Sequence, residues 1–133
     1  MKAVRFIPIA IAAAILISRP VQAHEIRAGN LVIVHPMVDE AAEGQAISRG
    51  SMEIRNEGNT ADQLLFISSE FAEQSQIGGS SPVTIPAKGR AAVAVLFRKV
   101  KAKLSEDEAY VGELTLEKAG KIKIDFLVHT HKH

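Results

Sequence analysis

The histidines of this chain are its clearest candidates for chemistry. The five residues are His24, His35, His129, His131 and His133. Imidazole is the commonest protein ligand for transition metals. The sequence has no cysteine, so a site built from these residues would rely on nitrogen rather than on thiolate sulfur. The spacing therefore predicts a metal site made from the ends of a folded domain rather than from its core.

The first 23 residues have the three-part order of a secretory signal peptide. Lys2 and Arg5 provide a positive start, residues 6–17 are almost wholly apolar, and the stretch ends Val21-Gln22-Ala23. The apolar run is shorter than the roughly 20 residues that a membrane-spanning helix needs. We therefore expect cleavage before His24, export to a bacterial periplasm and no membrane anchor after processing.

Three regions follow from this interpretation: a signal peptide (1–23), one β domain (24–128) and a His-rich C-terminal tail (129–133). Loss of the three positive charges of the signal peptide lowers the formal net charge from +1 to −2. A near-neutral chain with interspersed Lys and Glu does not favour nucleic acid as a partner. The remaining 110 residues suit a single domain. We expect a monomer that is held together by an apolar core without disulfides.

Short apolar runs between turn residues predict an all-β fold of about seven strands, a sandwich or small barrel. The clearest strand alternates Ile122, Ile124, Phe126 and Val128 against polar neighbours. A charged stretch, 99–108, is expected to be a long loop. The predicted strands cover residues 31–34, 46–56, 63–68, 83–85, 91–97, 110–116 and 122–128.

The histidine tail is the first candidate metal site. If the last strand continues past Val128, alternation places His129, His131 and His133 together on the solvent face. Ligation by nitrogen alone suits Cu(II), Zn(II) or Ni(II). Copper is the cofactor that we expect, with zinc as a second candidate. The alternative is a solvated polar tail that binds no metal.

His24 is the second candidate metal ligand. As residue one it would offer a free α-amine and an imidazole, which can chelate Cu(II) as a pair, and a further histidine would complete a T-shaped site. The alternative is that His24 is simply the residue after the signal peptide. His35 precedes a proline at a predicted strand end, which is more typical of a structural histidine, although it could lie near His24.

An enzyme is not expected. An oxygenase would need an aromatic substrate-binding face, but the chain has one tyrosine and no tryptophan. The serines lack the Gly-x-Ser-x-Gly context of a hydrolase nucleophile.

Four segments resemble, in order, the periplasmic copper chaperones called PCuAC. They are residues 29–36, the pattern Asn56-x-Gly58-x-x-x-Asp62-x-Leu64, the turn at 85–89, and residues 114–120. The resemblance implies a cupredoxin-like Greek-key β-barrel. It also implies copper handling, with copper-delivery or oxidase-assembly proteins as partners.

The ligands of that family are not carried over. The family binds Cu(I) through two His and two Met, including a His-x-Met segment. In this chain, Gly78 falls where the family's first histidine would be expected. The methionine-bearing hairpin of the family is missing before Pro82, and residues 96–99 contain no His-x-Met. Met37 and Met52 are assigned to packing, so little Cu(I) binding is expected.

Two functional hypotheses remain open. In the first, the chain is a divergent PCuAC-like copper protein that binds Cu(II) through its terminal histidines and assists copper delivery to a terminal oxidase. In the second, it is a metal-free binding or scaffold domain that kept the fold and lost the copper site.

Overall fold

The structure, a computed structural model, describes residues 25–79, 81–106 and 108–130. This part of the chain contains only strands and connecting turns, so the all-β prediction is confirmed. It also contains no helix long and apolar enough to span a membrane. The strands are β1 (Glu25–Ala28), β2 (Leu31–Asp39), β3 (Ile47–Asn56), β4 (Asp62–Ser69), β5 (Ala72–Ile77), β6 (Val83–Ile85), β7 (Arg90–Val100), β8 (Ala109–Leu116) and β9 (Gly120–His129).

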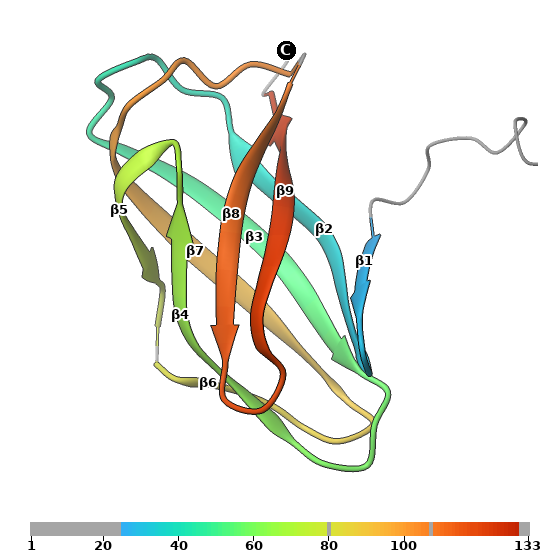
Figure 1. Cartoon of the computed structure of the whole chain (residues 1–133). Coiled ribbons are helices and arrows are strands. Elements are labelled where there is room, and N and C mark those ends of the chain that lie inside the picture. The colour runs from blue at the N-terminus through green and yellow to red at the C-terminus, as the bar shows by residue number, and fades with distance from the viewer. Residues whose placement is uncertain (1–24, 80, 107, 131–133) are drawn as a thin grey trace, which may run out of the picture.

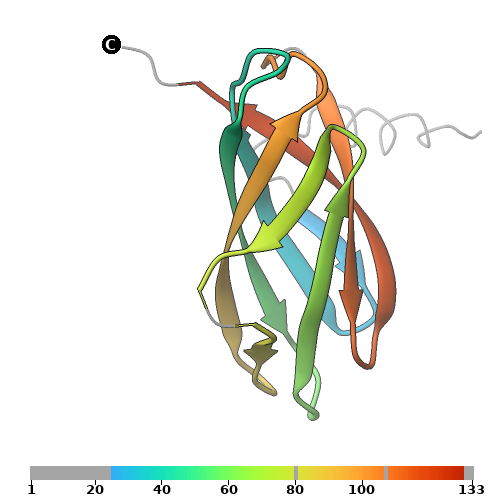
Figure 2. The same ribbon diagram turned by 90° about the vertical axis from the view of Figure 1, so that its left-hand side faces the viewer.

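The strands form one curled sheet with the order β5-β7-β3-β2-β9-β8-β4-β6, and β1 pairs with β2 beside this path. The curl brings β5-β7-β3-β2 to face β9-β8-β4-β6, so that the sheet wraps around a common interior (Figures 1 and 2). The two halves are joined by β2 and β9, which pair in parallel over three residues. The cupredoxin-like fold class is therefore confirmed.

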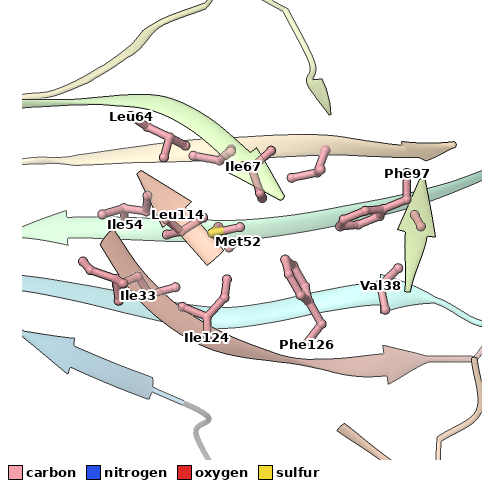
Figure 3. Packing of buried hydrophobic residues seen from close by; sticks show 14 of the residues in the cluster. Ile33, Val38, Met52, Ile54, Leu64, Ile67, Phe97, Leu114, Ile124 and Phe126 are labelled. Atoms are coloured by element: carbon pink, nitrogen blue, oxygen red, sulfur yellow. The ribbon is translucent and has the colours of Figure 1, made fainter. Parts of the chain in front are cut away.

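The interior is built by the alternating strands that the sequence indicates. In β9 Ile122, Ile124, Phe126 and Val128 are buried, whereas Lys123 and Asp125 are exposed. Side chains from both halves of the sheet meet between them (Figure 3). At one end Phe97 and Phe126 pack edge to face with ring centroids 5.3 Å apart, and Phe71 lies 4.8 Å from Phe97. Burial of this apolar surface is the main term that stabilises the fold.

Two strands of the nine were not predicted. β1 (Glu25–Ala28) is only four residues long, and β5 (Ala72–Ile77) is polar at all but its two end positions. Neither carries the alternation from which strands are predicted. In β4 the apolar run is not buried throughout, because Phe66 is 66% exposed. The pairing of β4 with β8 shifts register between Leu64 and Phe66, which explains the outward turn.

β2 also departs from prediction, because it does not end at His35-Pro36 but continues to Asp39. Its pairing with β3 shifts register between Val34 and Met37, and His35 has a φ of 51°. The bulge accommodates a proline, which cannot donate a ladder hydrogen bond, inside a central strand.

The charged stretch after β7 is a loop, as predicted, but it starts only after Val100. Leu104 is buried and forms an isolated bridge with Ala41, with hydrogen bonds in both directions between the two backbones.

Candidate functional site

The first strand, β1, and the end of the last strand, β9, pair with the same edge of β2. The other edge is occupied by β3, which pairs with Leu31–Val34 and with Met37 and Val38. On the edge opposite β3, β1 pairs with Leu31–Val34 and the end of β9 pairs with Met37–Asp39. The two stretches leave a break at residues 35 and 36. β1, which follows the predicted ligand His24 in the sequence, and the end of β9, which contains the predicted ligand His129, therefore adjoin a single strand.

His35 lies at this break. Its side chain is exposed, while Pro36 after it is buried. A φ of 51° is in the left-handed region, which costs a residue with a β-carbon about 1–3 kcal/mol and is concentrated at functional sites. The prediction that His35 lies at the end of a strand is wrong. Its exposure also gives it no packing role that would make it a structural histidine.

His129 closes β9 and is exposed on the same face as Lys123 and Asp125, as predicted. Its backbone carbonyl accepts a hydrogen bond of 3.1 Å from the Glu40 N–H. In the parallel register His129 is the partner of Asp39. A groove of about 370 Å³ lies over this junction and is lined by Met37, Asp39, Arg49, Gly50, Ser51 and His129.

The remaining predicted ligands, His24, His131 and His133, lie outside the described residues. Within the described ranges, no three His, Cys, Asp or Glu side chains are grouped so that they could hold a metal ion. Asp39, the β2 residue that pairs with His129, lies four residues after His35. This spacing corresponds to roughly 13 Å at the rise of a strand. The break in β2 and the end of β9 are therefore two separate places.

The region of the family's ligands offers no substitute. Gly78 follows β5, and its N–H donates a 2.8 Å hydrogen bond to the Ala94 carbonyl. Met52 is 5% exposed inside the core, which confirms its packing role (Figure 3). Met37, in contrast, is only half-buried and lines the groove beside His129. The sequence did contain a pattern that points to Met37 as a candidate ligand, since His35-Pro36-Met37 has the His-x-Met spacing.

The segments that resemble PCuAC proteins meet at the opposite end of the domain. Asn56, at the end of β3, is 3% exposed. Its side-chain amide donates to the carbonyls of Thr60 (2.8 Å) and Ile85 (3.3 Å), and its oxygen accepts from the Gly58 N–H. Its own backbone N–H donates to the Gly89 carbonyl. Asn56 thus joins the segment at 54–64 to the turn at 85–89.

Asp62 adds the third segment. It is 5% exposed, and its carboxylate accepts hydrogen bonds from the backbone N–H groups of Gln63 and Lys118 at 2.8 Å and of Ala119 at 2.9 Å. These bonds hold the turn between β8 and β9 against the start of β4. Asn56 and Asp62, which belong to the residues that carry the resemblance, are therefore structural.

Comparison with known proteins supports the same fold. No family model and no curated protein matches the chain. Among solved structures, the apo PCuAC domain from PmoF1 is 26% identical with a TM-score of 0.75, and the match covers 81% of this chain and 100% of that one. The copper-bound PCuAC domain from PmoF2 is 22% identical with a TM-score of 0.74, covering 81% and 99% of the two chains. Its apo form is 22% identical with a TM-score of 0.70, covering 80% and 95%. The chain therefore has a PCuAC-like fold.

Proposed function

We propose that the chain is a periplasmic copper-handling protein that binds Cu(II) through its terminal histidines after removal of residues 1–23. The observation that carries this proposal is the sharing of one edge of β2 by β1 and β9. Histidines far apart in the sequence thereby belong to segments that adjoin the same strand. The likeness to PCuAC domains, one of them copper-bound, supports copper as the metal.

The first site of the proposal is formed by His24 and His35. Glu25 pairs with Val34 in the antiparallel register, and continuation by one residue would bring position 24 opposite His35. The α-amine and imidazole of His24 would then supply two nitrogens, and the exposed imidazole of His35 would supply a third. Three nitrogen ligands in this arrangement suit Cu(II).

The second site is the tail. His129 ends β9 on the solvent face, and we propose that His131 and His133 join it there as nitrogen ligands. Zn(II) would compete here, because imidazole also suits zinc.

In the cell such a monomer would hold copper for transfer rather than catalyse a reaction. We propose that its partners are copper-delivery or oxidase-assembly proteins. Ligands at the ends of the domain suit transfer, because a partner can reach them without opening the core.

The rival is a metal-free scaffold domain. It is favoured by the lack of a ready-made metal cluster in the described part of the chain. Metal titration separates the two functions.

The tail histidines are expected to account for one bound Cu(II). We predict that a variant with His129, His131 and His133 all changed to alanine loses one equivalent of Cu(II), because three imidazoles are removed at once. Alanine substitution keeps the backbone bond between the His129 carbonyl and Glu40, which truncation would break. Native mass spectrometry of the processed protein with added Cu(II) gives the stoichiometry.

A matched control is the change of Lys121 and Lys123 to alanine, since both side chains are exposed on β9 and neither is a metal ligand at neutral pH. This control should bind as the wild type does. Equal stoichiometry in the wild type and the tail variant would remove the tail from the proposal. Lack of Cu(II) binding by the wild type would favour the scaffold domain.

Metal binding is expected to be uncoupled from folding. The apolar interior of the described residues contains neither His35 nor His129, so the chelator-treated protein should keep its β-sheet circular dichroism and a cooperative melt. Saturating Cu(II) should raise the midpoint only in proportion to the logarithm of metal concentration over Kd. A non-cooperative melt after chelation would mean that a ligand lies inside the fold.

A further inference from the structure

Met37, which was predicted to be a packing residue, offers a soft sulfur ligand next to His129. We infer that Met37 and His129 form a Cu(I) site on the outer face of β2 and β9. The inference rests on the proposed copper function and extends it to the reduced ion.

The register determines how these two side chains lie. Met37 pairs with Leu127 and Asp39 pairs with His129 across the parallel β2–β9 junction. Met37 and Asp39 are two residues apart on one strand, so they share a face, and partners in parallel register also share a face. The diagonal between the Cα atoms of Met37 and His129 is therefore about 8 Å, which long side chains can span.

Exposure distinguishes this methionine from the other one in the domain. Met37 is half-buried and lines the groove of about 370 Å³, and the exposed His129 lines the same groove. Met52 is 5% exposed within the apolar core. The thioether of Met37 is therefore accessible to an ion in the groove, whereas that of Met52 is not.

The chemistry of the groove favours the monovalent ion. A thioether is a soft ligand that selects Cu(I), and imidazole also suits copper. Both groups are neutral when they coordinate a metal. Asp39 and Arg49 line the same groove with opposite charges, which leaves its formal charge balanced. A balanced site lacks the excess of negative charge that would favour a divalent cation.

The composition of the chain makes the test unusually specific. It has no cysteine and three methionines, of which Met1 lies in the segment removed on processing. Sulfur in the first coordination shell of copper can therefore come only from Met37 or Met52. X-ray absorption of the Cu(I)-loaded protein reports this sulfur directly.

The experiment compares Met37→Leu with Met52→Leu in the processed protein loaded with Cu(I). Both changes conserve volume, so both variants should fold. We expect a copper–sulfur shell in the wild type and in Met52→Leu, and its loss in Met37→Leu. Cu(I) affinity, measured by competition with a chromogenic chelator, should fall about tenfold or more in Met37→Leu, since even an outer-shell partner can contribute that much. His129→Ala should weaken Cu(I) binding to a similar extent.

Three outcomes would overturn the inference. One is the lack of a copper–sulfur shell in the wild type, and another is a shell that persists in Met37→Leu. The third is a shell that depends on His35 but not on His129, which would assign the methionine to the His35-x-Met37 pair instead. None of these outcomes would change Cu(II) binding by the terminal histidines. The proposed function is therefore tested separately, by the Cu(II) titration.

Discussion

The Asp62→Ala variant is expected to be about 2–4 kcal/mol less stable than the wild type, which is a large part of the stability of a small domain. The substitution removes a buried carboxylate that accepts three backbone N–H bonds. Two of these donors, in Lys118 and Ala119, belong to the turn between β8 and β9. Without an acceptor each donor loses its partner away from bulk water, which costs about 1–3 kcal/mol for a buried group.

Urea unfolding of the processed protein measures the effect as a lower midpoint with an unchanged slope. Asp62→Asn should give an intermediate loss, because one oxygen remains as an acceptor while an amino group meets a donor. Glu117→Ala is the matched control, since this exposed carboxylate lies beside the same turn and its loss should change stability by less than about 0.5 kcal/mol. An Asp62→Ala variant as stable as the control would show that solvent replaces these bonds.

The role of Asp62 and Asn56 explains how the chain can resemble a copper-chaperone family and lack that family's ligands. These two side chains join three distant segments by hydrogen bonds at the end of the domain away from His129. Their geometry requires a particular residue type at each position. The family's ligand positions are not involved in these bonds, and at one of them the chain has Gly78, which contributes only its backbone.

The fold was predictable where burial produces alternation. β7 and β9 have an apolar residue at every second position, and the buried face of β9 was predicted correctly. β5 pairs with β7 over most of its length but is polar, so its formation depends on backbone pairing that sequence alternation does not reveal. Phe66 lies in an apolar run and is nevertheless exposed, because of a register shift that the sequence does not show.

The candidate site was predictable in its residue types but not in its arrangement. The sequence indicated histidines at both ends, and the solvent face of His129 followed from the phase of β9. The accessibility of His35 and Met37 depends on a bulge within β2. The sharing of one β2 edge by β1 and β9 depends on a parallel pairing between residues about 90 positions apart. Local sequence patterns carry neither piece of information.

Blocking the α-amine of His24 is expected to lower Cu(II) affinity at the first site about 100-fold or more. Selective acetylation of this amine near neutral pH, where it is less protonated than the lysine side chains, leaves every side chain intact but removes the amine as a ligand. The amine and the imidazole act as two linked arms, and linking contributes about 10²–10⁴ to the affinity of a two-point interaction. The acetylated protein should therefore retain only the weak binding of separate imidazoles.

The measurement is a Cu(II) competition titration in the background that lacks the three tail histidines, so that the two sites do not overlap. Intact mass first establishes that the reference protein from the periplasm begins at His24, because a longer chain would lack the chelating amine. Nitrogen hyperfine structure in the electron paramagnetic resonance spectrum should lose one contribution in the acetylated protein and one in His35→Ala. If acetylation leaves affinity unchanged while His35→Ala lowers it, the amine is not a ligand. If neither change has an effect, continuation of the β1–β2 register to position 24 does not create a copper site, and Cu(II) binding must reside in the tail.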